Sequence, residues 1–387
     1  MRSRVAVASV ALLAAGCSGL LGASTTPVAE PAPVAPQSIS QEVIGQTPWP
    51  VKTRYVVDLW LHGYAMLETD SSGVPDFRRD YRDAMVVEKN SRNITTQLDA
   101  NTDALRRGLR QNPALILGQD LVLKEQSWEE MGNDIAAFLT AGDSAGGGGR
   151  DGRPSILSTW KRTKGPSAET TDMMTALGRI YRTESDRAWL KLFALSLTDE
   201  HSKFYEQYWR GQQRTMRPVL AAVDSQFSQR YLKYFRSYLR GVQLSTGEIL
   251  LSLPLDREGR TFLAGQHSIA IGFPVSADSS LEAVYTFAHE AAGVVAERGV
   301  QEGTTVAEQR SGVAGRYVSP AEVRGGAMLL QRAIPELVAG YEQHYLSASR
   351  VPTSGANVDT VFVRAFPLRQ PIADAMDRML DSAMRGS

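Results

Sequence analysis

The sequence predicts a mainly helical α+β protein: a large helical lobe, then a small antiparallel sheet, then a buried helix that carries His289 and Glu290. Three observations predict this fold class. Apolar residues recur at helical intervals between about residues 53 and 245. Near residue 246 this pattern changes to two strand-like runs, and helical periodicity then returns for the rest of the chain. The length of 387 residues and the hydrophobic content of 43% are ordinary for one large or two average globular domains.

The first 17 residues have the pattern of an export signal. A basic start, Met1–Arg4, precedes the apolar run Val5–Ala15, which is shorter than the roughly 20 residues needed to span a bilayer. The run ends in small residues before Cys17, the single cysteine of the chain. This junction resembles the lipobox of bacterial lipoproteins, which implies a signal peptide at residues 1–17, lipidation of Cys17 and export to the bacterial cell envelope. The alternative is an ordinary secretory signal that is removed together with Cys17.

Residues 18–50 are predicted to be a disordered tether. They are rich in Ala, Pro, Ser and Thr, so they can bury little apolar surface, and their prolines favour an extended chain. We expect this segment to hold the folded part away from the membrane, to which the lipid on Cys17 would attach it.

Residues 51–245 are expected to form the helical lobe. Helical spacing is clear from Val56 to Leu67, from Met173 to Tyr181 and from Val219 to Leu239. The last of these segments carries five aromatic residues, which helical spacing assigns to the core rather than to a stacking platform. Residues 140–153 include four consecutive glycines and are expected to be a flexible loop. Neither a preceding strand nor a following Gly-Lys-Ser/Thr supports phosphate binding there.

Residues 246–387 are expected to form the second lobe. Glu248–Leu253 and Thr261–Phe273 are predicted to be antiparallel strands joined through the turn-forming sequence Pro254–Gly259. Helices follow. The signals that bound them are a capping box at Ser279 and Glu282, a second at Ser319 and Glu322, an interruption at Pro335, and a terminal helix over Ala373–Met384.

The helix after Ser279 should be largely buried. At 100° per residue, Val284 and Ala288 share one apolar face, and Phe287 lies on the opposite side. His289 and Glu290 fall in the narrow polar stripe between these faces. Because a buried polar stripe must meet partners or face a cleft, these two residues are the strongest candidates for chemistry.

A strand hairpin followed by a buried His-Glu helix resembles the zincin metallopeptidases. In that family the helix carries His-Glu-x-x-His, whose two histidines bind zinc while the glutamate activates the bound water. The resemblance, over roughly residues 246 to 345, implies that His289 is a zinc ligand, that Glu290 is the general base, and that a peptide or protein is the substrate. It also implies that the strand with His267–Phe273 is an edge strand along which the substrate lies. The second histidine is replaced by Gly293, so the motif here is His-Glu-x-x-Gly and one ligand is missing.

Three acidic residues are weighed as the missing ligand. Glu322 is expected to complete its own capping box, and Glu336 to lie in the first turn of a helix, where acidic residues are favoured in any case. Glu297 is two turns beyond His289, about 12 Å along the helix axis, which is too far to reach the same ion easily.

Four further histidines are possible partners of the same ion. His62 lies among apolar residues and is expected in the core, while His201 is expected at a helix boundary. His344 is expected to be solvated, and nothing in the sequence places His267 relative to His289.

Composition limits the remaining functions. Lys plus Arg and Asp plus Glu both total 42, so the net charge is zero and no nucleic-acid partner is expected. No nucleophile elbow of the Gly-x-Ser-x-Gly type is expected, and the lone cysteine is assigned to the membrane anchor, so serine and cysteine hydrolases both have little support. Two hypotheses remain: an envelope lipoprotein that is a zinc-dependent peptidase or a degenerate relative of one, and a non-catalytic binding or scaffold lipoprotein of the envelope.

Overall fold

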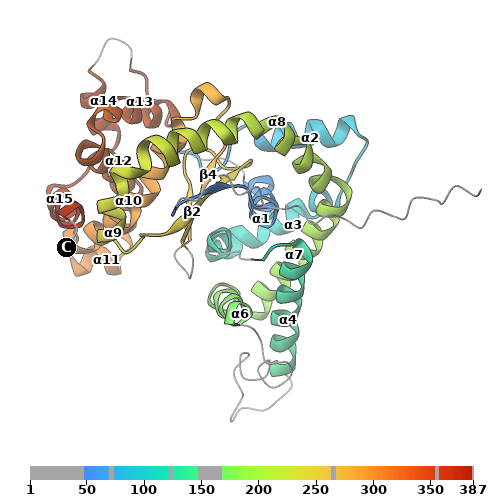
Figure 1. Cartoon of the computed structure of the whole chain (residues 1–387). Helices are drawn as coiled ribbons and strands as arrows, with labels where there is room; N and C mark the ends of the chain where they lie inside the picture. Colours follow the sequence, from blue (N-terminus) through green and yellow to red (C-terminus); the bar gives the residue numbers. More distant parts are fainter. Residues whose placement is uncertain are drawn as a thin grey trace, which may run out of the picture. The chain divides into compact units, whose positions relative to one another are not determined.

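The computed structural model describes residues 48–68, 74–121, 125–146, 168–262, 267–353 and 357–385 (Figure 1). All of these residues belong to one compact unit, Gln41–Ser387. This unit is mainly helical and contains a four-stranded sheet, which confirms the predicted fold class. The predicted signal peptide, Cys17 and the tether up to Thr47 lie outside the described residues.

Helices make up most of the described chain. In order they are α1 (Tyr55–Leu67), α2 (Tyr81–Ser91), α3 (Gln97–Gln111), η1 (Pro113–Asp120), α4 (Trp128–Gly146), α6 (Ala168–Ile180), α7 (Glu184–Glu200), η2 (His201–Tyr205), α8 (Glu206–Asp224), η3 (Ser225–Tyr231), α9 (Leu232–Gly241), η4 (Ala277–Ser279), α10 (Glu282–Gly303), α11 (Val306–Arg310), η5 (Val313–Tyr317), α12 (Val318–Ala333), η6 (Pro335–Leu337), α13 (Val338–Ala348), α14 (Val358–Ala365) and α15 (Gln370–Arg385). None of them is both long and apolar enough to cross a membrane.

The segment from α7 to α9 is continuous helix, visible as the green-to-yellow ribbon in Figure 1. It contains two π-helical turns, η2 and η3, and the residues on either side of each turn keep right-handed helical backbone angles. Four of the five aromatic residues predicted for the core near its end are buried, and the fifth, Tyr234, is 44% exposed.

The sheet is mixed, so the prediction of an antiparallel sheet is wrong. Its strands are β1 (Val51–Lys52), β2 (Gly247–Ser252), β3 (Arg260–Phe262) and β4 (His267–Gly272), in the order β1-β2-β4-β3. β2 is parallel to both β1 and β4, and only β3 and β4 are antiparallel. The chain leaves β2, forms the outer strand β3 first, and then returns as β4 between the two.

This topology corrects two further expectations. The predicted strand Thr261–Phe273 is two strands, β3 and β4, and β4 is an inner strand rather than an edge strand. In addition, β1 brings Val51–Lys52 into register with Ile249 and Leu250. The sheet therefore joins residues from both sides of the predicted lobe boundary at residues 245 and 246.

Helix α10, which carries His289 and Glu290, is largely buried, as predicted. It packs against α12, α15 and the sheet. Phe287 contacts the aromatic rings of Trp49, Phe227 and Phe235, with ring centroids 4.5–5.4 Å apart. These contacts fix α10 against η3, α9 and the start of the described chain, so its polar residues have defined neighbours.

Both predicted capping boxes are absent. Leu281 is the N-cap of α10 and has no polar side-chain atom with which to cap it. Ser279 instead belongs to a capping box with Ser276 at η4. Ser319 lies inside α12, which begins at Val318. The side chain of Glu322 is therefore not committed to a helix cap.

The C-terminal helices follow the sequence more closely. Pro335 interrupts the helix after α12, and helix resumes in α13, as predicted. The terminal helix α15 extends beyond Ala373–Met384 at both ends, and α14 was not predicted.

Candidate metal centre

Glu258, His289 and Glu322 converge at one place in the fold. Each offers one ligand atom, and these atoms all lie within 4.8 Å of one another. The three residues come from the segment before β3, from α10 and from α12. One imidazole nitrogen and two carboxylates are a donor set suited to a divalent metal ion.

The segment that carries Glu258 is held by an earlier part of the chain. Leu255 forms an isolated antiparallel bridge with Phe77. The backbone N–H groups of Asp256 and Glu258 donate to the carbonyls of Asp76 and Pro75, at 3.1 and 3.3 Å. These bonds fix the position of the backbone that carries the Glu258 side chain. Oε2 of Glu258 is buried and has no hydrogen-bond partner among the described residues.

His289 is 1% exposed and points one ring nitrogen at acidic groups. Its Nε2 lies 3.3 Å from Oε1 of Glu258 and 3.6 Å from Oε1 of Glu290. The ring stacks on Tyr345, with centroids 5.1 Å apart, and the Tyr345 hydroxyl donates to the carbonyl of Arg257 at 3.2 Å. Nδ1 of His289 has no partner within the described part of the chain.

Glu322 reaches the centre across the backbone of Gly293. A Cβ atom at Gly293 would lie 4.0 Å from Oε1 of Glu322, an ordinary van der Waals distance. The position at which the zincin motif has its second histidine is therefore next to a carboxylate from α12. Among the candidates weighed from sequence, Glu322 is the one that the fold brings to His289.

The charges of the centre shift the pKa values of its members. Burial alone would lower the pKa of His289, but Glu258, Glu290 and Glu322 outweigh it and raise this pKa to about 9. Burial raises the pKa of Glu322 to about 7, opposed by His289 and reinforced by Glu258 and Glu290. Burial also acts to raise the pKa of Glu258, yet His289 holds it below its usual value. Carboxylates crowded in this way favour a bound cation.

Glu290 lies beside the three residues and is anchored to β3. Its Oε1 accepts from the backbone N–H of Gly259 at 2.8 Å, and its Oε2 accepts from Oγ1 of Thr261 at 2.7 Å. A Cβ atom at Gly259 would lie 2.7 Å from Cγ of Glu290, so only glycine permits this approach. Burial raises the pKa of Glu290, and His289 opposes the rise. A general base working near neutral pH needs a shift in this direction.

The other predicted histidines do not join the centre. His62 is fully buried and bonded to Tyr81 and Glu200, as expected for a core histidine. His201 is the first residue of η2, directly after α7, and the helix continues through it. His267 begins β4 and is not part of the cluster.

The prediction that His344 is solvated is wrong. The residue is 6% exposed, because α13 packs its ring against Tyr285 and Tyr345. Burial holds its pKa well below the usual value, so this imidazole is neutral.

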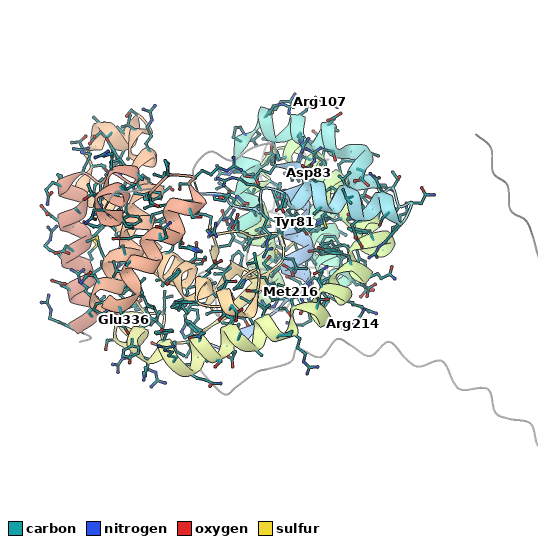
Figure 2. All side chains as sticks on the ribbon, turned by 90° about the horizontal axis from the view of Figure 1, so that it is seen from above. Tyr81, Asp83, Arg107, Arg214, Met216 and Glu336 are labelled. Carbon is teal, nitrogen blue, oxygen red and sulfur yellow. The ribbon has the colours of Figure 1, made fainter. Side chains whose placement is uncertain are left out.

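The remaining acidic candidates lie elsewhere. Glu336 is exposed in η6, and Figure 2 shows it at the surface of the C-terminal helices. Glu297 is exposed further along α10. Neither belongs to the group around His289.

Sequence reasoning missed Glu258 and Tyr345. Glu258 lies within Pro254–Gly259, where its residue type was attributed to turn formation, and it has no fixed spacing from His289. Tyr345, on α13, likewise has no sequence spacing that links it to His289. No signal in the sequence marks Glu258, because its segment is placed by contacts with residues 75–77 that form only in the folded chain.

A serine-hydrolase pattern also occurs in the sequence. Residues 142–146, Gly-Asp-Ser-Ala-Gly, match Gly-x-Ser-x-Gly, but they form the end of α4. A nucleophile elbow requires a sharp turn from a strand into a helix, which is absent at this point of the described chain. Residues 140–146 were predicted as part of a flexible loop but belong to helix α4, so this part of the prediction is wrong; residues 147–153 lie outside the described residues.

Comparisons with known proteins found no similar protein or family. No family model matches the chain, and searches of the curated proteins and of the solved structures found no match.

Proposed function

We propose that this chain is a metal-dependent hydrolase of zincin type, in which Glu258, His289 and Glu322 hold a zinc ion. The observation that carries the proposal is the convergence of these three ligand atoms within 4.8 Å, on a buried helix that also carries Glu290. A carboxylate from α12 stands beside Gly293, where the family motif has its second histidine.

The donor set fits zinc. Zinc takes imidazole nitrogen and carboxylate oxygen, and a catalytic site commonly has three protein ligands and one open position. Without a cation, the centre places three carboxylates around one imidazole, and Oε2 of Glu258 is buried with no partner in the described chain. A divalent ion would neutralise this charge and satisfy that oxygen.

Each residue around the centre has its own role in the proposed hydrolysis. Bound zinc supplies Lewis acidity, which polarises a carbonyl and lowers the pKa of water. Glu290, with a pKa raised by burial, accepts a proton close to His289. Gly259 and Thr261 orient its carboxylate, and Tyr345 fixes the plane of the His289 ring. A peptide or protein is the proposed substrate, in keeping with the zincin type.

The proposed location is the bacterial cell envelope. The basic start, the apolar run and Cys17 support an exported lipoprotein held to a membrane by its N-terminal lipid. The proline-rich tether would place the helical body, and with it the metal centre, outside the lipid.

A second candidate is a non-catalytic scaffold lipoprotein with a decayed centre. Both oxygens of Glu290 already accept hydrogen bonds, one from Gly259 directly before β3 and one from Thr261 in β3, so this residue also joins α10 to the sheet. In that case the ion pair between His289 and Glu258 would be structural, and no metal would be required.

Metal analysis and two substitutions separate the two candidates. Protein lacking residues 1–17 should contain about one equivalent of zinc, and Glu258→Gln should lose it. Glu290→Gln should keep both the zinc and the fold but reduce peptide hydrolysis about 100-fold or more, because the base is lost. Protein without zinc, or full hydrolysis by the Glu290→Gln variant, would reject the catalytic proposal.

A further inference from the structure

A basic stripe runs along the helix from α8 to α9. From Gln207 to Gly247 the chain contains a single acidic residue, Asp224, which is 4% exposed. We define the basic stripe as Arg230, Lys233, Arg236 and Arg240, which all lie in exposed positions. Their spacing of three or four residues places them on one face of the helix.

The charges of the basic stripe are available to a partner. None of its four residues forms a salt bridge with another described residue, in contrast to Arg210 on α8, which pairs with Glu206 at 2.6 Å. Arg214 continues the positive charge along the outer side of α8, where Figure 2 labels it. In a chain with zero net charge, this surface is locally and strongly positive.

Aromatic side chains accompany the charges. The ammonium group of Lys233 lies 4.9 Å from the ring centre of Tyr234, and the guanidinium of Arg230 lies 4.9 Å from that of Tyr231. Tyr234 is 44% exposed, although the other aromatic residues of α9 are buried. An exposed tyrosine beside basic residues is typical of a surface that meets lipid headgroups.

The basic stripe lies where the described chain begins. Arg236 and Arg240 line a hollow together with Pro48 and Trp49. Residues 1–47 precede this point, and they include Cys17, the proposed site of the lipid. The chain that leads from Cys17 therefore enters the described body beside α9, next to the basic stripe.

We infer that the basic stripe docks the protein on an anionic phospholipid surface. The charge is complementary, the exposed tyrosine suits the headgroup layer, and the chain leads from this face to the predicted anchor. Docking through α9 is independent of any metal at α10. It adds a second attachment to the single lipid, and two attachments give more stable membrane binding than one.

Vesicle co-sedimentation tests the inference. The protein should lack residues 1–17, so that neither the apolar run nor a lipid binds the vesicles; the compact unit Gln41–Ser387 remains whole. We expect binding to vesicles that contain phosphatidylglycerol, loss of binding in 0.5 M salt, and little binding to phosphatidylcholine alone. Replacing all four residues of the basic stripe by glutamine should weaken binding by about 600-fold, at about fivefold per charge.

A matched variant controls for total charge. Arg82, Arg107, Arg110 and Lys191 are also exposed and form no salt bridge with a described residue, so changing these four to glutamine removes the same charge elsewhere. This control should bind like the parent, and both variants should keep its melting temperature. Equal weakening by both variants, or equal binding to neutral vesicles, would overturn the inference. So would tight binding to a DNA oligonucleotide without binding to anionic vesicles.

Discussion

The carboxylate of Glu322 faces the backbone of Gly293, at a distance of 4.0 Å from the place where a Cβ atom would be. The two residues lie on different helices, α10 and α12, so this relationship comes from packing and not from local sequence. In the proposed metal centre, Glu322 takes the place of the second histidine of the zincin motif. Because Gly293 has no side chain, the space between α10 and the carboxylate oxygen of Glu322 stays free.

Gly293→His should restore the motif and strengthen zinc binding. An imidazole at this position would lie one turn from His289 and would put a nitrogen donor in the place that the Glu322 carboxylate occupies. Zinc has a higher affinity for such a site than for one rich in carboxylates. We expect the dissociation constant for zinc to fall about tenfold or more, measured by competition with a chromogenic chelator.

Gly293→Ala is the matched control for that substitution. Its Cβ makes only ordinary van der Waals contact with Glu322, so the affinity for zinc should stay within about threefold of the parent. If Gly293→His weakens zinc binding while Gly293→Ala leaves it unchanged, the ligand atoms do not meet at this point, and the proposed centre is wrong.

Zinc binding should strengthen as the pH rises from 6 to 8. His289, with a pKa of about 9, and Glu322, with a pKa of about 7, hold protons at pH 6, and zinc must displace them. At pH 8 the Glu322 carboxylate is already ionised, so the dissociation constant should be at least about tenfold lower than at pH 6. Calorimetry in two buffers of different ionisation enthalpy should detect fewer released protons at pH 8. A flat dependence over this range would contradict the assigned ligands.

The sequence predicted the helix of the site better than its surroundings. The sequence pattern of α10 has two apolar faces, which predicted that the helix is buried. The polar stripe between these faces identified His289 and Glu290 as candidate site residues. Nothing local could report Glu258 and Glu322, because each reaches the site only after the chain has folded. For Glu322 the local pattern was misleading, since Ser319 three residues earlier fits a capping box that does not form.

The prediction of an antiparallel sheet was wrong for a different physical reason. Two strands separated by a short turn-like segment favour a hairpin, and the segment after β2 has such a composition. The contrary signal was in Ile249, Leu250 and Leu251, a continuous apolar run rather than an alternating one. All six residues of β2 are buried, as is typical of a central strand with parallel neighbours.

Gly259→Ala should disturb the site through Glu290. The new Cβ would lie 2.7 Å from both Cγ of Glu290 and the carbonyl oxygen of Ala270, so β3 or the Glu290 side chain must move. We expect a loss of about 1–3 kcal/mol in the free energy of unfolding and a lower rate of any peptide hydrolysis. Urea denaturation measures the first effect.

Gly132→Ala controls for the change in residue type. Gly132 lies inside α4 with no neighbouring atom within 4 Å, so alanine should stabilise the protein by about 0.5–1 kcal/mol. A Gly259→Ala variant as stable as the parent would show that Glu290 is not held against β3.

A second buried ionic group involves α1, α2 and α7, away from the proposed metal centre. Glu200 is fully buried and accepts from Nε2 of His62 at 3.0 Å, from Nζ of Lys89 at 3.2 Å and from the hydroxyl of Thr96. These contacts join α1, α2 and α7 immediately before the π-helical turn η2. Every oxygen of the carboxylate has a partner, so the group is suited to holding helices together.

Glu200 should make the protein sensitive to acid. Burial acts to raise its pKa, but His62, Lys89 and Thr96 outweigh burial and lower the pKa to about 2. Because the pKa in the folded protein is below the unfolded value of about 4.5, this group stabilises the fold above pH 4.5. Its contribution, on the order of 3 kcal/mol, should be lost as the pH falls from 4.5 toward 2.

Glu200→Gln should lower the stability at pH 7 by about 3 kcal/mol, because Lys89 loses a buried partner, and should remove this part of the acid dependence. Glu88→Gln breaks only an exposed pair with Arg92, and it should cost less than about 0.5 kcal/mol and leave the acid dependence intact. Denaturant titrations at pH 7, 5 and 3 measure both variants, and an unchanged acid dependence in Glu200→Gln would refute the assignment.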